Sequence, residues 1–490
     1  MPDLVIDGVG AASLSPATLD RLPAAIGRPS YDRAGLPVRV AHLGVGAFHR
    51  CHQAEYLEDL IEGGHWRGAE VGINLMPPDL SRTLGPQGGL YSRTLAEGDR
   101  AETRVLGAIT HWADGPGGAA WLARPGVSVV TLTVTEKGYC HVPATGLLDL
   151  GHPGVVADLT GVAMPVTVPG LLVAALGARA AAGSGPLALV SCDNIAGNGA
   201  VLRAVVRGMA ERAAPHLLTW IDDNVSFPCT MVDRIVPATT DDDRAEVGLR
   251  LGLADAAPLR GEPFRQWVIE DDFRGARPPW EAAGAEIVGD VAAHETVKMR
   301  VLNGAQTMLA LLGALRGHRF TCQAVADAGL SSFVTATLRD ETLPHLPPAQ
   351  GMAHAPYLAQ AMARIANRAI QHRCHQIATD TSQKIRQRIL DPLRARRVAG
   401  LAAPGLETAL AAWLACLRAG RWEVSDPVAA QVAGITAQAP RDLGRFVAGV
   451  LGIGAIFGDD LGRDEALARR LTGKVALLLE RREIGGPVPR

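Results

Sequence analysis

The chain has 490 residues, of which 48% are hydrophobic, and its 48 basic and 50 acidic residues leave a formal net charge of −2. This length exceeds what one hydrophobic core serves and predicts two or three domains. The near balance of charge gives no reason to expect nucleic acid or an anionic membrane surface as a partner. No apolar run reaches the roughly 20 residues of a bilayer-spanning helix.

The cysteines and the start of the chain indicate the cellular compartment. The seven cysteines form no C-x-x-C pair, which is typical of a reducing environment. Residues 1–4, Met-Pro-Asp-Leu, lack the basic start and apolar core of a signal peptide. We therefore expect a cytoplasmic protein.

The first informative pattern is a strand, a glycine turn and a helix. Residues 38–43 read as a short buried strand, and a helix runs through residues 53–60. Between them, Gly44 permits a tight turn, and Gly46 lets backbone N–H groups approach a pyrophosphate. His49 stands where the third glycine of a dinucleotide-binding loop is usual. A G-x-G turn alone is a weak signal, so a turn that binds nothing stays open.

An acidic residue follows the next strand, residues 69–75. Asp79 is placed to accept hydrogen bonds from the hydroxyls of an adenosine ribose and to repel a 2′-phosphate. This position favours NAD over NADP. The alternative is an ordinary turn aspartate.

Two further apolar runs, residues 127–134 and 186–191, have the character of parallel strands buried on both faces. Polar residues follow each of them, and ligands bind at the carboxyl ends of strands in open α/β sheets. Asn194 is a neutral donor suited to a substrate oxygen, or else a plain turn residue. These repeated units predict an α/β fold with a doubly wound parallel sheet.

From about His294 the pattern becomes helical almost to the end of the chain. We predict a cofactor-binding domain over residues 1–287 and a helical domain that binds substrate and supplies catalytic groups over residues 288–490. Residues 262–271 alternate in a way that suggests a strand. The polar and basic run at residues 377–388 is either functional or a solvated linker.

The second domain begins with a helix, residues 295–315, that carries polar side chains in an apolar run. Lys298 and Gln306 share one helix face, and Asn303 lies on the neighbouring face. A lysine facing a buried pocket loses hydration, which lowers its pKa and suits it to act as a general base. Gly304 costs about 1 kcal/mol relative to alanine in a helix interior, so we expect something to approach the backbone there. The alternative is a solvated pair of Lys298 and Arg300.

Metal catalysis is not expected. The local histidine and cysteine clusters lack the spacing of a complete zinc-ligand set, and they are His49 with His52, and His372 with Cys374 and His375.

Taken together, several segments resemble the long-chain polyol-specific dehydrogenases, the mannitol dehydrogenase family. The matching stretches run in family order across most of the chain, and they are residues 42–50, 132–140, 191–194 with 198–199, 227–237, 262–270, Lys298 with 302–304, and 382–384. The resemblance implies a Rossmann-type domain followed by a helical domain, with an active site in the cleft between them. It also implies metal-independent hydride transfer between NAD(H) and a secondary alcohol or ketone, in a protein that is often a monomer.

The resemblance also implies roles for particular residues. Lys298 corresponds to the general base, and Asn194 and Asn303 to the amides that hold the reacting oxygen. Cofactor contacts are expected from Gly44, Gly46, Ala47, Phe48, Asp79, Thr135, Val232 and Asp233. Substrate contacts are expected from Asp233, Arg300, Gln306 and Lys384.

Three departures from the family pattern affect the substrate side. Gln306 stands where a histidine is usual, Thr381 where glycine is usual, and Arg386 where proline is usual. Arg386 adds a cation that could pair with a carboxylate. The expected substrate is an open-chain sugar acid, D-fructuronate or D-mannonate, with D-mannitol and related pentitols or hexitols as the alternative. The change at Gln306 keeps open a protein that binds NAD or a polyol without turnover.

Overall fold

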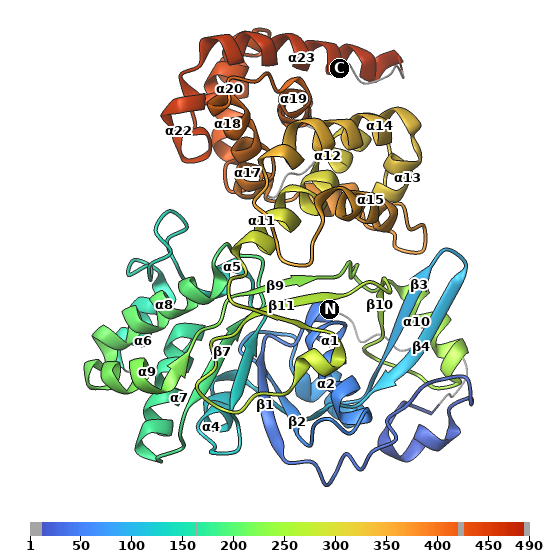
Figure 1. The fold of residues 1–490 in the computed structure, drawn as a ribbon, viewed down its shortest axis with the longest axis vertical. Helices are drawn as coiled ribbons and strands as arrows, with labels where there is room; N and C mark the ends of the chain where they lie inside the picture. The colour runs from blue at the N-terminus through green and yellow to red at the C-terminus, as the bar shows by residue number, and fades with distance from the viewer. Residues whose placement is uncertain (1–11, 162–163, 420–425, 485–490) are drawn as a thin grey trace. The chain divides into compact units, whose positions relative to one another are not determined.

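The computed structural model describes residues 12–161, 164–419 and 426–484 (Figure 1). Residues 1–4, on which the expectation of no signal peptide rests, lie outside this part. The chain divides into two compact units, Met1–Ala292 and Ala293–Arg490, called here the first and the second unit. This division falls a few residues beyond the boundary expected between residues 287 and 288.

The first unit is built on a six-stranded sheet in which every neighbouring pair is parallel. Across the sheet the strands are β5 (Ile109–Asp114), β2 (Ala69–Asn74), β1 (Val38–Leu43), β6 (Val129–Leu132), β7 (Leu187–Ser191) and β8 (Val225–Ser226). Counted in chain order within this sheet, the arrangement is 3-2-1-4-5-6, the doubly wound order of dinucleotide-binding domains. The order reverses between β1 and β6. The predicted fold of this unit is therefore confirmed.

Both faces of the parallel sheet are buried. Successive residues of a strand point to opposite faces. Val130 and Leu189 pack with side chains from α7 and α8, whereas Val129 and Val190 pack with Trp267 and α2. Apolar residues are needed on both faces, which explains the continuous hydrophobic runs in the sequence. The helices of this unit are α1 (Ala47–Arg50), α2 (Gln53–Glu62), α3 (Leu80–Thr83), α4 (Ala119–Leu122), α5 (Thr135–Gly138), α6 (Pro153–Thr160), α7 (Val168–Ala181), α8 (Asn198–Ala213), α9 (Leu218–Asn224) and α10 (Asp241–Leu251).

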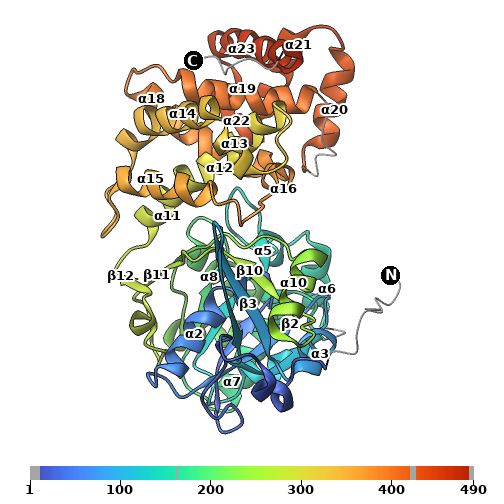
Figure 2. The same cartoon turned by 90° about the vertical axis from the view of Figure 1, so that its right-hand side faces the viewer.

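Two smaller sheets complete the first unit. One contains β3 (Tyr91–Glu97), β4 (Arg100–Leu106) and β10 (Leu259–Gly261), and Figure 2 shows β3 beside β10. The other contains β9 (Thr230–Asp233), β11 (Gln266–Glu270) and β12 (Glu286–Val288). The strand expected within residues 262–271 is β11. The sequence pattern did not predict the β3–β4 hairpin.

The described part of the second unit is helical (Figures 1 and 2). Its α-helices are α11 (Ala292–Arg300), α12 (Leu302–Leu315), α13 (Thr321–Ala326), α14 (Ala328–Thr337), α15 (His354–Ile365), α16 (Cys374–Ala378), α17 (Thr381–Ile385), α18 (Asp391–Val398), α19 (Pro404–Arg418), α20 (Ala429–Gln438), α21 (Leu443–Leu451), α22 (Gly454–Gly462) and α23 (Glu465–Ile484). One large hydrophobic cluster joins most of them. Among the described residues, no helix is both long and apolar enough to cross a membrane.

The single helix expected over residues 295–315 is wrong in one respect. The structure interrupts it at Val301, where φ is −93° and ψ is −69°. Lys298 therefore lies on α11, while Asn303 and Gln306 lie on α12. The apolar periodicity continues through both helices, so a departure at one residue leaves no trace in the pattern.

Candidate functional site

The turn after β1 has the geometry of a loop that takes an anion. Gly44 has φ of +89°, and a Cβ atom there would lie 2.2 Å from the carbonyl oxygen of Thr133, so only glycine fits. Gly46 is exposed, and the nearest atom to a Cβ built on it would be 3.8 Å away. Within the described residues, nothing accepts the backbone N–H groups of Gly46, Ala47 or Phe48. These donors fit a pyrophosphate.

The side chain of Asn74, the last residue of β2, connects this turn to the loop that follows β2. Its side-chain oxygen accepts the N–H of Val45 at 2.7 Å, and its amide nitrogen donates to the carbonyl of Pro78 at 3.0 Å. Both the strand end and the turn are buried at this contact. Sequence reasoning missed Asn74, although a polar residue that directly ends an apolar strand was the available signal.

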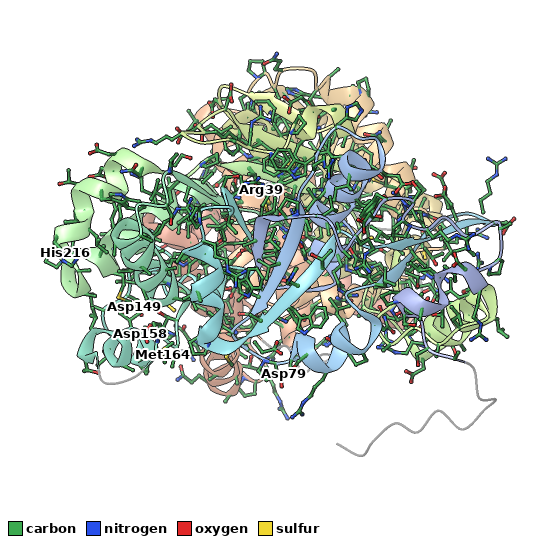
Figure 3. All side chains as sticks on the ribbon, turned by 90° about the horizontal axis from the view of Figure 1, so that it is seen from below. Arg39, Asp79, Asp149, Asp158, Met164 and His216 are labelled. Carbon is green, nitrogen blue, oxygen red and sulfur yellow. The ribbon has the colours of Figure 1, made fainter. Side chains whose placement is uncertain are left out.

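Asp79 directly precedes α3 and keeps its carboxylate at the surface. Its side chain is 41% exposed, with the Arg82 guanidinium 3.6 Å away. The first N–H groups of α3, at Leu80 and Ser81, donate instead to Asp114 of β5 at 2.6 and 3.0 Å. The Asp79 carboxylate is therefore not used as a helix cap. Figure 3 shows it at the margin of the first unit.

The segment after β6 makes a strained turn. Thr135 has φ of +63°, a left-handed conformation that costs a β-branched residue about 1–3 kcal/mol. The carboxylate of Asp193, just beyond β7, accepts the N–H groups of Val134 and Thr135, each at 2.9 Å. The Tyr139 hydroxyl also donates to it, at 2.8 Å. Burial raises the pKa of Asp193 to about 6, although these hydrogen bonds act in the opposite direction.

Asn194 follows Asp193 directly and is exposed. A second amide connects this loop to β9. The Asn198 side chain donates to the carbonyls of Asp193 and Thr230 at 3.0 and 2.9 Å, and it accepts the N–H of Thr230 at 2.9 Å. Within the first unit, the structure thus brings the loops that carry Thr135 and Asn194 together with β9, which ends at Asp233.

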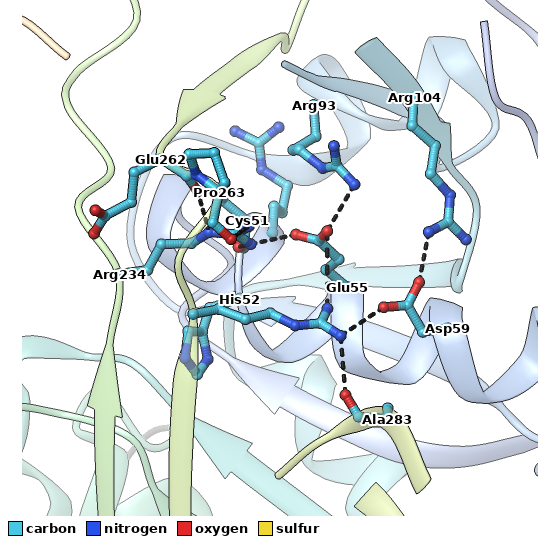
Figure 4. A network of polar contacts seen from close by, with 12 residues as sticks. Cys51, His52, Glu55, Asp59, Arg93, Arg104, Arg234, Glu262, Pro263 and Ala283 are labelled. Atoms are coloured by element: carbon cyan, nitrogen blue, oxygen red, sulfur yellow. Dashed lines mark hydrogen bonds and ion pairs between the residues drawn. The ribbon is translucent and has the colours of Figure 1, made fainter. Parts of the chain in front are cut away.

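Val232 and Asp233 are buried at the end of β9, and the next residue fixes that end. Arg234 forms an ion pair with Glu55 of α2 and donates to the carbonyl of Cys51. Figure 4 shows this ion-pair network around Glu55, which Arg93 also contacts at 2.7 Å. The network is structural, and it connects the residue that follows β9 to α2.

In the second unit, Lys298 is only 4% exposed. Asn303 is also buried, and its amide nitrogen lies 2.9 Å from the sulfur of Met299. The approach expected at Gly304 is modest, since a Cβ there would lie 3.5 Å from the carbonyl oxygen of Arg388, an ordinary contact. The solvated position considered for Lys298 does not match this burial.

The substrate-side candidates occupy three elements of the second unit. Arg300 ends α11, Gln306 lies on α12, and Lys384 lies on α17, where its amine donates to the carbonyl of Thr379 at 2.7 Å. Burial lowers the pKa of Arg300, while Asp391 acts in the opposite direction.

Arg386 is different, because its side chain is 66% exposed and lies 4.0 Å from Asp391. The run at residues 377–388 is not a solvated linker. The buried Ser382 backbone and hydroxyl both donate to Asp426, at 2.9 and 2.5 Å, and Arg388 donates to Thr307 of α12 at 2.9 Å.

Among the described residues, no group of three or more His, Cys, Asp or Glu side chains is arranged to hold a metal ion. The arrangement of the first unit is that of a dinucleotide-binding domain, with the glycine turn at the point where the strand order reverses.

Comparisons with known proteins agree with this class. The family model described as the mannitol dehydrogenase Rossmann domain matches residues 38–282, and the mannitol dehydrogenase C-terminal domain matches residues 290–479. D-Mannonate oxidoreductase of Escherichia coli is 38% identical over 93% of this chain and 96% of its own. Mannitol 2-dehydrogenase of Cereibacter sphaeroides is 39% identical over 79% of this chain and 82% of its own.

One solved structure adds to these matches. Pseudomonas fluorescens mannitol 2-dehydrogenase, in a ternary complex with NAD and D-mannitol, has a TM-score of 0.86 at 30% identity, covering 96% of this chain and 97% of that one. The chain belongs to the mannitol dehydrogenase family, as the sequence motifs predicted, and it is an oxidoreductase.

Proposed function

We propose that the protein transfers a hydride between NAD(H) and a secondary alcohol or ketone of an open-chain sugar acid, with D-mannonate and D-fructuronate as the pair. The observation that carries the proposal is the burial of Lys298 on α11, with Asn303 buried at the start of α12. A lysine amine withdrawn from water suits proton abstraction from a hydroxyl group.

The cofactor assignment rests on the first unit. The N–H groups of Gly46, Ala47 and Phe48 hold the pyrophosphate, and the exposed side of Gly46 leaves room for it. The surface carboxylate of Asp79 accepts from the ribose hydroxyls and repels a 2′-phosphate, which selects NAD. Thr135, Val232 and Asp233 complete the cofactor side. NAD supplies the hydride acceptor in the oxidation.

The chemical step needs a base and fixed donors. The Lys298 amine takes the hydroxyl proton of the alcohol. The side-chain amides of Asn194 and Asn303 donate hydrogen bonds to the oxygen as negative charge develops on it. Removal of one such donor typically lowers kcat by about 10²- to 10³-fold. In the reductive direction, the protonated lysine returns the proton to the new alkoxide.

The choice of a sugar acid rests on cations and on a relative. Arg300 and Lys384 lie in the second unit with Arg388, and they offer the positive charge that a substrate carboxylate requires. The match to D-mannonate oxidoreductase over almost the full chain points the same way. Arg386 contributes less to the choice because it is exposed beside Asp391.

D-Mannitol oxidation is the second candidate. It is favoured by the fold match to a mannitol 2-dehydrogenase, with a TM-score of 0.86. In that case the far end of the substrate is a neutral hydroxymethyl group, and Gln306 suits it as a neutral hydrogen-bonding partner.

A substrate panel tests the proposal. The purified protein is assayed by NADH absorbance with D-mannonate, D-mannitol and other pentitols and hexitols, and in reverse with D-fructuronate and D-fructose, with NADP as the cofactor control. We expect the highest kcat/KM for the mannonate–fructuronate pair with NAD. A kcat/KM for mannonate no better than that for mannitol moves the assignment to the second candidate. Absence of turnover with every substrate, with NADH still bound, identifies a binding protein instead.

A further inference from the structure

The carboxylate of Asp193 occupies a concave set of backbone donors after β6. Its Oδ1 accepts the N–H of Thr135, and its Oδ2 accepts the N–H of Val134 and the hydroxyl of Tyr139. The same hydroxyl lies 2.5 Å from the Oγ of Ser191, the last residue of β7. The side chain of Asp193 therefore connects the segments that follow the adjacent strands β6 and β7.

The backbone conformation of the turn depends on this anion. Val134, with φ of −109° and ψ of 5°, is followed by Thr135 in the left-handed region. Consecutive residues of this kind turn their N–H groups toward one point and create an anion-binding nest. Here the anion is the protein's own Asp193. Without a negative charge at that point, the two N–H groups repel each other, and a β-branched residue has no reason to stay left-handed.

The backbone of the same aspartate is fixed from the other side. Its carbonyl accepts the side-chain amide of Asn198 at 3.0 Å and the N–H of Ile195 at 2.9 Å. Asn194 lies between these fixed points, so its backbone is restrained while its side chain remains exposed. Asn198 also bonds Thr230 at the start of β9. Asp193 is thus the residue common to the loops that carry Thr135 and Asn194.

We infer that Asp193 is a positioning residue, which holds Thr135 against the cofactor and Asn194 at the reacting oxygen through one carboxylate. This inference rests on the proposed function, because it takes the roles of Thr135 and Asn194 from it. Asp193 itself touches neither substrate nor cofactor. Its contribution is the geometry of two residues that do.

The test is Asp193→Asn, because an amide keeps the size of the side chain but cannot accept three hydrogen bonds, and it presents a donor to the nest. The chain offers a matched control in Asp158 of α6. Its Oδ1 accepts the N–H of Val166 at 2.8 Å, and its Oδ2 accepts the N–H and the hydroxyl of Thr167 at 3.1 and 2.5 Å. Figure 3 shows Asp158 on the helical side of the first unit. No candidate site residue is among its partners.

Both variants are measured for thermal unfolding, NADH binding by fluorescence, and kcat and KM for the substrate that the panel selects. We expect both to lose similar thermal stability. Only Asp193→Asn is expected to lower kcat, by roughly 10- to 100-fold, because a displacement near 1 Å at a catalytic group costs up to 100-fold. It should also weaken NADH binding about 5-fold or more. Asp158→Asn keeps kcat within about 2-fold of the natural protein.

Equal kcat values for the two variants, with the natural protein active, overturn the inference and leave the proposed function standing. A natural protein that neither binds NADH nor turns over any panel substrate overturns both. If Asp193→Asn fails to fold, Tyr139→Phe tests the inference in its place. That variant removes one of the three hydrogen bonds to the Asp193 carboxylate and keeps the two from backbone N–H groups. A kcat reduced about 3-fold or more then supports the inference, and a kcat within about 2-fold overturns it.

Discussion

His49 and Glu70 lie 3.0 Å apart, from ring Nε2 to carboxylate Oε1, and both side chains are fully buried. The ring of His49 also stacks on His42, with 3.4 Å between the ring centroids. His42 in turn contacts the hydroxyls of Thr131 and Thr133 at 2.7 and 2.8 Å. Burial lowers the pKa of both histidines well below the usual value, so the rings are neutral near neutral pH.

This arrangement predicts a pH dependence of stability. Burial raises the pKa of Glu70 to about 7 from 4.5, with His42 acting in the opposite direction. The folded protein therefore holds a proton that the unfolded chain releases near pH 4.5. The stability linked to this group is present below pH 4.5 and is lost as the pH rises toward 7. Glu70→Gln does not ionise and should gain up to about 3 kcal/mol relative to the natural protein across that interval.

Urea unfolding at pH 5 and pH 7.5 measures this difference, with about 3 kcal/mol as its upper bound. Glu97→Gln, at the exposed end of β3, is the control and should show no such change. A constant difference between Glu70→Gln and the natural protein at the two pH values would show that Glu70 does not hold its proton in the folded state.

The two glycines of the turn should respond differently to alanine. Gly44→Ala places a Cβ 2.2 Å from the Thr133 carbonyl at φ of +89°, which should lower the free energy of unfolding by about 2–4 kcal/mol. Gly46 has an ordinary φ of −108° and open space beside it. Gly46→Ala should therefore keep its thermal stability and weaken NADH binding about 10-fold or more, because the methyl group occupies the path of the pyrophosphate. Thermal unfolding and NADH titration separate the two effects, and equal NADH affinity in Gly46→Ala and the natural protein would contradict the cofactor assignment.

Asn74→Ala tests how the turn is supported. It leaves the N–H of Val45 buried without an acceptor, which should cost about 1–3 kcal/mol of stability and loosen the turn. Both the melting temperature and the affinity for NADH should fall. Asn224→Ala is the control, since that amide donates to the carbonyl of Trp220 in its own helix. A melting temperature lowered without any change in NADH affinity would mean that Asn74 supports the fold alone.

Lys298→Ala should abolish most of the turnover. The loss of the base is expected to lower kcat by about 10²- to 10⁴-fold, with NADH binding within about 2-fold of the natural protein. An added small primary amine should restore part of the rate. Lys474→Ala is the control, because this partly buried lysine of the same unit donates to Thr408 at 2.8 Å and has no proposed catalytic part. An unchanged kcat in Lys298→Ala would show that Lys298 is not the general base.

Charge removal should separate the two substrate classes. Arg300→Gln and Lys384→Met each remove a cation, and each should lower kcat/KM for mannonate about 10-fold or more, with a smaller effect on mannitol. Arg469→Gln, an exposed arginine near Glu465, serves as the control. The ratio of kcat/KM for the two substrates is the measurement. An unchanged ratio in both variants would favour the polyol as substrate.

The parallel sheet could be predicted because its strands are buried on both faces and appear as continuous apolar runs. The β3–β4 hairpin could not, because it buries Arg93, whose charge is compensated by Glu55 from a distant segment. A polar residue in the sequence predicts an exposed position only when water, and no other side chain, solvates its polar group. The strand expected over residues 127–134 was also too long, since β6 ends at Leu132 before the chain turns at Thr135.

The candidate site shows the same limit. Sequence motifs singled out Asn194 and Lys298, which follow or interrupt apolar segments. They gave no role to Asp193, Asn198 or Asn74, whose importance lies in which backbone groups they reach. Several of those groups belong to turns that follow other strands, and they become neighbours only in the folded sheet.

The ion-pair network around Glu55 has a consequence for synthesis of the protein. Arg234, which pairs with Glu55, lies 179 residues later in the chain, and Arg265 contacts the same carboxylate at 3.8 Å. A nascent chain emerging from the ribosome therefore carries Glu55 long before two of its three arginine partners have been made. Until residue 234 has been made, Glu55 has Arg93 as its partner but lacks the ion pair that joins α2 to the end of β9. A fragment that stops before residue 234 should therefore be less stable than the full chain.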